Sequence, residues 1–179
     1  MGLKLSELPA NEEIFIDANI FLYSAFKHPV FGNKCKNFLI RIEKDEIKGY
    51  TSDFVLNEIF HKLMIAEVVK KFGIAAKQVV RFVKKKPEVI AELETVWTEM
   101  EIIKGFNISI LNGSLFPDFI KISKRYWLMA TDAFHVATMK KHGIMNIATN
   151  DSDFERVEWI KVWKPFKKKV IENKSVESV

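Results

Sequence analysis

The sequence has a single cysteine and no long uninterrupted hydrophobic segment among its 179 residues. Cys35 alone cannot form an internal disulfide, and a lone thiol is typical of proteins in a reducing compartment. No segment approaches the ~18 consecutive apolar residues of a membrane-spanning helix. Residues 1–13 contain no apolar stretch followed by a small-residue cleavage site. We therefore expect a cytoplasmic protein that does not associate with membranes.

Two common phosphate-binding motifs are also missing. The sequence contains neither G-x-G-x-x-G nor G-x-x-x-x-G-K-[ST], so dinucleotide binding and P-loop hydrolysis lack their phosphate-binding loops. There is no internal repeat, low-complexity tract or Gly/Ser-rich linker, and the seven Gly and five Pro are scattered between the expected elements. Because the length is that of about one domain, residues 1–179 are predicted to form a single domain.

Apolar and basic residues are abundant. Hydrophobic residues make up 48% of the chain and include fifteen Phe and four Trp, enough for a core without disulfides or a structural metal. Lys and Arg outnumber Asp and Glu by 28 to 23, giving a net charge of +5 and a pI near 9.2. This balance favours polyanionic partners, although a basic surface can also serve solubility alone.

Some basic and aromatic residues could contact a nucleic acid. Lysines at 84–86, 140–141 and 167–169 could follow a phosphate backbone, although such runs are most often solvated surface. Trp127 and Trp163 are expected in the core or at an interface, as is Trp159. Stacking of these indoles on bases, as in single-strand binders, is the less favoured interpretation.

Short apolar segments alternate with segments of helical periodicity. Strands are expected at 14–16, 50–51, 108–111 and 146–149, and helices at 20–25, 34–44, from 52 or 53 to 73, 75–85, 88–103, 117–124 and 131–143, the last capped by Thr131. This alternation predicts an α/β fold with a parallel sheet connected by right-handed crossovers. In such sheets, ligands bind beyond the C-terminal ends of the strands.

Acidic residues fall where the predicted strands end. Asp17 directly follows the first strand, and Asp151 and Asp153 follow the last one. Asp132 begins the helix before the last strand, and Glu58 lies in the helix after the second. Taken one at a time, the aspartates have simpler interpretations, as a helix cap, a favourable charge at a helix N-terminus or an Asx turn. Together, they are predicted to converge at one edge of the sheet.

A cluster of carboxylates needs a positive charge to balance it. Glu58 is expected to be buried, because FVLNEIFHKL surrounds it with apolar residues, and an unpaired buried carboxylate costs several kcal/mol or shifts its pKa. No cationic residue is expected within the cluster. A hard divalent cation with oxygen ligands, Mg²⁺ or Mn²⁺, would compensate the charge. The cluster therefore suggests metal-assisted hydrolysis of phosphodiesters.

Four segments carry a specific resemblance. IFIDANIFLY, LNEIFHKL, ATDAFHVATMKKHG and IATNDSDFERV occur in this order between about residues 14 and 162. They resemble the four motif regions of PIN-domain ribonucleases, especially the VapC-type toxins. The resemblance implies a PIN-like fold, with a central parallel sheet flanked by helices. It also implies that the catalytic metal ligands are Asp17, Glu58, Asp132 and Asp151. Asp153 would be a further ligand or a supporting group. Asn19 and Thr149 would orient the carboxylates or a water.

The resemblance further implies a Mg²⁺- or Mn²⁺-dependent endoribonuclease that acts on RNA, forms a homodimer and is often neutralised by a small antitoxin protein. The chain differs from compact members of the family by a longer helical middle, about 70–104, and a basic C-terminal tail, about 163–179. An RNA-processing PIN nuclease without an antitoxin is therefore an alternative. Another is a PIN fold that binds RNA or a protein without cleavage, although the complete set of acids argues against it.

Two helical segments also contain an acid and a histidine three residues apart. Glu58 precedes His61 and Asp132 precedes His135, a spacing that also occurs in di-iron sites of helical bundles. Such bundles lack the strands that flank the other acids of this chain. The histidines are therefore expected to be half-buried packing groups, and no His/Cys spacing is typical of a zinc site.

Overall fold

The computed structural model describes residues 3–113 and 116–166. Its strands form one parallel sheet in the order β1-β6-β5-β2-β3-β4. The strands are β1 (Leu3–Lys4), β2 (Glu13–Ile16), β3 (Lys48–Ser52), β4 (Ile108–Leu111), β5 (Asn146–Ala148) and β6 (Lys161–Lys164). The prediction of an α/β fold with a central parallel sheet is confirmed.

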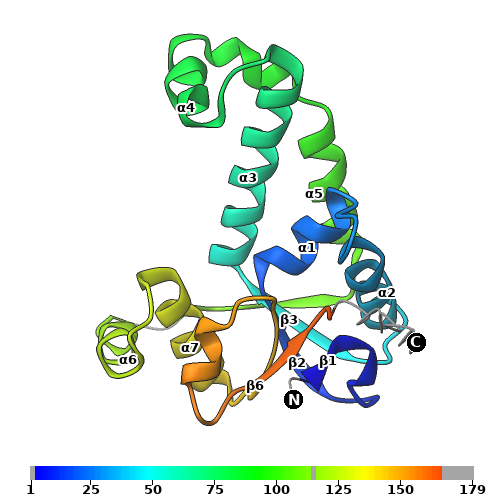
Figure 1. Cartoon of the computed structure of the whole chain (residues 1–179), viewed down its shortest axis with the longest axis vertical. Helices are drawn as coiled ribbons and strands as arrows, with labels where there is room; N and C mark the ends of the chain where they lie inside the picture. Colours follow the sequence, from blue (N-terminus) through cyan, green and yellow to red (C-terminus); the bar gives the residue numbers. More distant parts are fainter. Residues whose placement is uncertain (1–2, 114–115, 167–179) are drawn as a thin grey trace, which may run out of the picture.

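Helices flank this sheet on both faces (Figure 1). The α-helices are α1 (Ala18–Ala25), α2 (Gly32–Glu43), α3 (Asp53–Phe72), α4 (Ala76–Lys85), α5 (Thr95–Gly105), α6 (Asp118–Tyr126) and α7 (Ala130–His142), and the 3-10 helices are η1 (Leu5–Glu7), η2 (Pro87–Glu92) and η3 (Asp153–Arg156). None of the described helices is both long and apolar enough to span a membrane.

The central strand β2 is apolar because it is covered on both faces. Phe15 contacts the ring of His135 on α7, with centroids 5.6 Å apart. On the α2 side, a Cβ at Gly49 of β3 would lie 2.8 Å from the side chain of Ile42 and 3.1 Å from that of Ile16. Glycine at this position therefore permits the close approach of α2 to the sheet.

The parallel register brings three strand ends together. Phe15 of β2 pairs with Tyr50 of β3 on one side and with Ile147 of β5 on the other. Because these three strands are adjacent and run in the same direction, the residues that follow them lie at one edge of the sheet.

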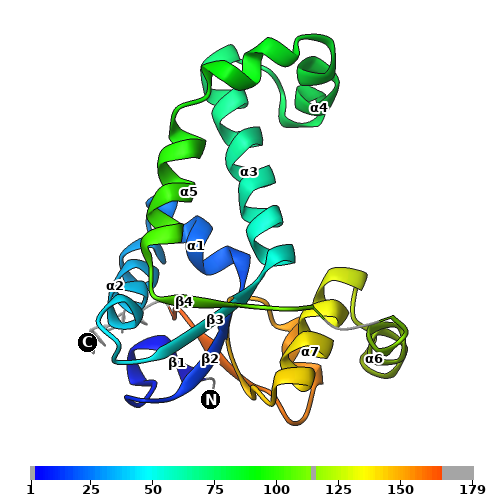
Figure 2. The ribbon, with the colours of Figure 1, turned by 180° about the vertical axis from the view of Figure 1, so that it is seen from behind.

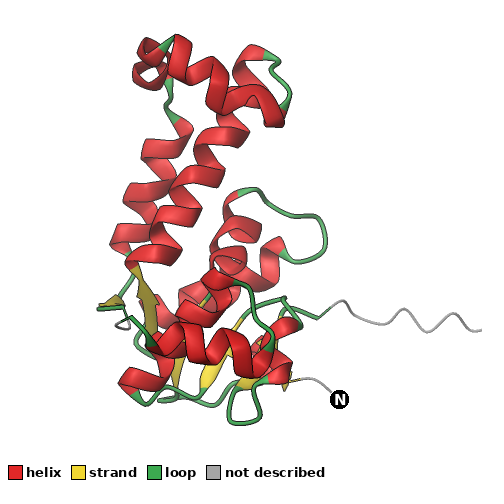
Figure 3. Ribbon diagram, turned by 90° about the vertical axis from the view of Figure 1, so that its left-hand side faces the viewer, coloured by secondary structure: helices red, strands yellow, loops and turns green. Residues whose placement is uncertain are grey.

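The helical middle extends away from the sheet. Helix α3 rises from the end of β3, α4 lies at its far end, and α5 returns beside α3 towards β4 (Figures 1 and 3). As predicted, α3 begins after Ser52, whose hydroxyl accepts a hydrogen bond from the Val55 N–H at 3.4 Å. It ends at Gly73, as predicted, where φ is 65° and the left-handed backbone suits glycine.

The prediction of one continuous helix at 88–103 is wrong. The segment divides into η2 and α5, with Leu93 and Glu94 between them. Pro87 begins η2, while the carboxylate of Glu67 on α3 accepts hydrogen bonds from backbone N–H groups at the start of α5. A helix boundary is therefore fixed by a residue of a neighbouring helix.

Three further differences concern a helix cap, two additional strands and the C-terminal tail. Thr131 does not cap α7, because the helix begins one residue earlier and Met129 occupies the N-cap position. Strands β1 and β6 were not predicted, and together they extend one side of the sheet (Figure 1). The predicted basic tail, about 163–179, therefore begins within β6, and residues 167–179 lie outside the described part of the chain.

Candidate functional site

The carboxylate of Asp17 is held at the junction of β2 and α1. Its side chain is only 8% exposed, and its Oδ1 accepts a hydrogen bond from the Ala18 N–H at 2.6 Å. Its Oδ2 accepts a bond from the Asn19 amide and another, at 2.6 Å, from the Thr149 hydroxyl. Asp17 is thus the N-cap of α1, and Asn19 and Thr149 fix its orientation.

The loop after β5 is tied to the same junction. The Asn150 N–H donates to the Asn19 side-chain oxygen at 3.1 Å, and the Asp151 N–H donates to the Thr149 hydroxyl at 3.0 Å. The Asp153 N–H then donates to the Asp151 carboxylate at 2.8 Å. Asx-type hydrogen bonds of this kind stabilise the turn and place both aspartates beyond the end of β5.

Electrostatic coupling joins the two aspartates that begin helices. Burial raises the pKa of Asp17 to about 6; hydrogen bonds from Thr149 and Ala18 partly oppose this shift, and the negative charges of Glu58 and Asp132 add to it. These interactions require that Asp17, Glu58 and Asp132 lie within Coulombic reach of one another.

Asp132 interacts with the remaining acids. It lies half-buried in the first turn of α7, and burial raises its pKa to about 6. The charges of Asp151, Asp153 and Glu58 raise this pKa further, whereas Arg156 lowers it. The structure therefore brings the five predicted acids to one edge of the sheet.

Two cations lie within this acidic edge, contrary to the sequence-based expectation. The side chain of Glu58 is 29% exposed rather than buried, and it forms an ion pair with Lys62 one turn further along α3, at 2.6 Å. Asp153 forms an ion pair with Arg156 at 2.8 Å. Glu58 is accessible because its side of α3 is not fully covered, so solvent and Lys62 both stabilise its charge.

Sequence spacing could have indicated both cations. Lys62 follows Glu58 by four residues in a helix, and Arg156 follows Asp153 by three, the spacings at which helical side chains meet. No sequence spacing could have indicated that Trp127 is exposed and that its carbonyl contacts Arg156, because both depend on the backbone of the turn between α6 and α7.

Within residues 3–113 and 116–166, no three His, Cys, Asp or Glu side chains are arranged so that they could hold a metal ion together. Lys62, Arg156 and the bonds to Asp17 occupy carboxylate oxygens instead. The donor set is nonetheless made of carboxylates, which suit hard divalent cations, and two of them have pKa values raised in part by neighbouring negative charge. The chemistry of the site fits such a cation, but these ion pairs would have to open for it to bind.

The expectation that these two histidines are half-buried is wrong. His61 is exposed on α3, whereas His135 is 1% exposed. In the described residues, neither ring nitrogen of His135 has a hydrogen-bond partner. Burial lowers the pKa of His135 to about 4, against the opposing charge of Glu58, so the ring is neutral at physiological pH.

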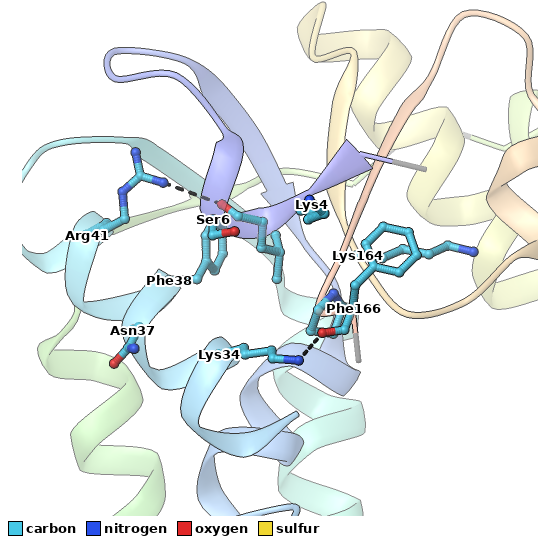
Figure 4. A pocket seen from close by; sticks show the side chains of 10 residues that line it. Lys4, Ser6, Lys34, Asn37, Phe38, Arg41, Lys164 and Phe166 are labelled. Atoms are coloured by element: carbon cyan, nitrogen blue, oxygen red, sulfur yellow. Dashed lines mark hydrogen bonds between the residues drawn. The ribbon is translucent and has the colours of Figure 1, made fainter. Parts of the chain in front are cut away.

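A pocket of about 460 Å³ lies apart from the acids, between η1, α2 and the segment after β6 (Figure 4). Lys34 donates a hydrogen bond to the Phe166 carbonyl, and Arg41 donates one to the Leu8 carbonyl at 2.8 Å. Lys164, also on the wall, is paired with Glu155. These basic side chains fasten neighbouring segments to one another.

The sheet order, the coupled acids at its edge and the four motifs define a class of protein. Residues 14–160 match the PIN domain, and the chain belongs to the PIN-domain family. Nucleases of this family are generally dependent on divalent metal ions.

Individual relatives agree with this assignment. The chain is 28% identical over 160 residues to ribonuclease VapC2 of Methanocaldococcus jannaschii, covering 89% of this chain and 96% of that protein. Its fold is similar to that in the structure of VapBC2 from Rickettsia felis bound to a promoter DNA fragment, with a TM-score of 0.54, 15% identity, and coverage of 85% of this chain and 98% of that chain. The DNA-bound VapBC of Salmonella typhimurium gives a TM-score of 0.51 at 12% identity, over 86% and 98% of the two chains.

Proposed function

We propose that the protein is a metal-dependent endoribonuclease that hydrolyses RNA phosphodiester bonds as the toxin of a toxin–antitoxin pair. The observation that carries this proposal is the coupling of five carboxylates, from β2–α1, α3, α7 and the loop after β5, at one sheet edge. Burial raises the pKa values of Asp17 and Asp132 to about 6, and the negative charges of the neighbouring acids add to the shift. The similarity to a ribonuclease along nearly the whole chain supports the same reaction.

Each residue has a defined part in the proposed site. Mg²⁺ or Mn²⁺ would be held by the carboxylates Asp17, Glu58, Asp132 and Asp151, with Asp153 as a further ligand or supporting group. Asn19 and Thr149 keep the Asp17 carboxylate in position through their hydrogen bonds. When bound, the ion would lower the pKa of an attacking water and stabilise charge on the phosphate oxygens.

The proposed partners are RNA, a small antitoxin and a second copy of the chain. The two solved structures described above are VapBC assemblies, which supports an antitoxin by analogy. We place this activity in the cytoplasm.

Cleavage of labelled RNA by the purified protein tests the proposal. We expect cleavage in Mg²⁺ or Mn²⁺ and none in excess EDTA. Asp17→Asn and Asp132→Asn should each reduce the rate by more than the ~10–100-fold that loss of a group supporting a metal ligand costs. The matched control is Glu88→Gln, because Glu88 is an exposed acid on η2, outside the acidic edge.

Undiminished cleavage in EDTA, or full activity of Asp132→Asn, would overturn the proposed mechanism. RNA binding without cleavage under all metal conditions would identify a binding module instead. Cleavage combined with a neighbouring reading frame that encodes no antitoxin would retain the nuclease and reject the toxin.

A further inference from the structure

Trp127 lies outside the core. Of the two expected locations, the core and an interface, the core is wrong for this residue, because it is 82% exposed, more than any other large hydrophobic residue in the described part of the chain. Met129, two residues later, is 75% exposed. Trp163, by contrast, is buried at 8% exposure, as predicted.

The backbone that carries this indole is fixed from several sides. Trp127 ends α6 in the left-handed conformation, with φ 53° and ψ 44°, which is uncommon for a bulky residue. The Leu128 N–H donates to the Ser123 carbonyl at 3.2 Å, and the Ser123 hydroxyl donates to the Leu128 carbonyl at 2.8 Å. Arg156 donates to the Trp127 carbonyl at 2.8 Å. A strained backbone persists only where its surroundings hold it, so the backbone position from which the exposed indole extends is fixed.

The same arginine connects Trp127 to the acidic edge. One terminal nitrogen of Arg156 bonds the Trp127 carbonyl, and the other bonds the Asp153 carboxylate, both at 2.8 Å. Only one guanidinium group therefore separates the backbone of Trp127 from a candidate site residue. Asp132 lies five residues further along the chain, in the first turn of α7.

Basic residues precede the indole. Lys124 and Arg125 lie in the last turn of α6. The Arg125 guanidinium lies 5.0 Å from the centroid of the Tyr126 ring and also forms an exposed ion pair with Glu158 at 2.9 Å. Basic groups that attract the backbone, combined with an exposed aromatic face, are what proteins use to bind single-stranded nucleic acids. The bases of an A-form duplex are stacked within the helix, so only an unpaired base can reach such an indole.

We propose that Trp127 stacks on an unpaired base of the RNA beside the phosphate group at the acidic edge. This proposal rests on the proposed nuclease function and adds a binding residue to it.

Binding of RNA with and without individual bases tests the stacking directly. The probes are a fluorescein-labelled unstructured RNA and a series of the same RNA with one abasic position each. Affinity is measured by anisotropy in the Asp132→Asn protein, in which slow cleavage keeps the RNA intact. Adding Trp127→Ala should weaken binding of the complete RNA about tenfold, within the range of base–aromatic stacking, whereas Trp127→Phe should keep most of the affinity.

The abasic series separates stacking from a structural effect. With Trp127 present, removal of one particular base should weaken binding about tenfold. In the Trp127→Ala protein the same removal should have little further effect, because the two changes eliminate one interaction. The control is Trp97→Ala, since Trp97 is 42% exposed on α5, which is well separated from α6 in Figures 1 and 2. It should bind all these RNAs as the parent protein does.

Cleavage provides an independent measurement. In the otherwise unchanged protein, Trp127→Ala should raise KM for single-stranded RNA about tenfold with a smaller change in kcat, and the melting temperature should stay the same because the indole is exposed.

Unchanged RNA affinity in Trp127→Ala, or equal losses for every abasic RNA in both proteins, would overturn the stacking proposal. A change in oligomeric state without a change in RNA affinity would overturn it too, by identifying a protein contact. RNA binding that depends on Trp127 in a protein that never cleaves RNA would instead overturn the proposed nuclease function alone.

Discussion

Burial shifts three titratable side chains near the acidic edge towards their neutral forms. It raises the pKa values of Asp17 and Asp132 to about 6 and lowers that of His135 to about 4. At neutral pH both aspartates are ionised and the imidazole is uncharged. The edge then carries the negative charge that a divalent cation requires, and His135 contributes no positive charge to balance it.

At the same scale, His135 predicts a dependence of stability on pH. The folded protein keeps this ring neutral down to about pH 4, whereas the unfolded chain binds a proton near pH 6.5. Because the unfolded state then holds more protons, the ring destabilises the protein increasingly as the pH falls from about 6.5 to 4. His135→Leu removes this effect and keeps an apolar group beside Phe15. Its stability relative to wild type should be greater at pH 5 than at pH 8 by about 2 kcal/mol, measured by urea unfolding in EDTA.

His61→Gln is the matched control, because His61 is exposed on α3. Its effect should be nearly the same at both pH values. A pH-independent difference between wild type and His135→Leu would show that the ring is protonated equally in the folded and unfolded states.

At the scale of elements, α5 begins on a carboxylate that belongs to α3. Glu67 accepts hydrogen bonds from the backbone N–H groups of Glu94, Thr95 and Val96, at 2.8, 3.0 and 2.8 Å. Burial alone would raise the pKa of Glu67, but these donors lower it below its usual value. The negative charge also interacts favourably with the positive end of the α5 dipole. One side chain therefore caps α5 and joins it to α3, within the part of the chain from α3 to α5 that extends away from the sheet (here called the projection).

Removal of this cap should destabilise the projection. Glu67→Ala loses all three charge-assisted hydrogen bonds and should cost about 2 kcal/mol, whereas Glu67→Gln keeps an acceptor and should cost less. Amide hydrogen exchange should accelerate most at Thr95 and Val96, and urea unfolding gives the total loss. Glu101→Ala is the control, because the ion pair of Glu101 with Lys104 is 72–76% exposed and worth little. Equal losses in Glu67→Ala and Glu101→Ala would contradict the assigned capping role.

Local signals explain which elements could be predicted. The ends of α3 follow from Ser52 and Gly73, each of which acts within a few residues of its own position. The start of α5 does not, because its cap comes from Glu67, 27 residues before Glu94. Strand β1 has two residues, too few for a recognisable alternation, and forms only by pairing with β6.

Over the whole molecule, the strand order explains why the candidate site could be grouped from the sequence. Once β5, β2 and β3 are adjacent and parallel, the acids after them must lie at one edge. The spacings from Glu58 to Lys62 and from Asp153 to Arg156 allow these ion pairs, but the sequence could not show that they form, because that depends on side-chain positions. The strand order therefore accounts for the grouping of the acids, whereas their partial neutralisation by Lys62 and Arg156 depends on how the side chains pack.

This partial neutralisation leads to a prediction about metal binding and global stability. Without metal, the acidic edge carries like charges that Lys62 and Arg156 only partly offset. A divalent cation that binds only the folded state at a hundredfold excess over its Kd should stabilise the protein by about 2.7 kcal/mol. We expect Mn²⁺ to raise the melting temperature at pH 7.5. The rise should be smaller at pH 5, where the raised pKa values of Asp17 and Asp132 keep both carboxyl groups largely protonated and unable to bind metal.

The contribution of the acidic edge to this effect can be isolated by substitution. Asp132→Asn removes one proposed ligand and also part of the repulsion, so its melting temperature should be higher than that of wild type in EDTA at pH 7.5 and should rise less on addition of Mn²⁺. Glu88→Gln should respond to the metal as wild type does, because Glu88 lies on η2 in the projection. Calorimetric scans at matched ionic strength give all three responses. If Mn²⁺ stabilises wild type and Asp132→Asn equally at pH 7.5, the cation binds elsewhere on the protein, and the acidic edge is held together by its ion pairs alone.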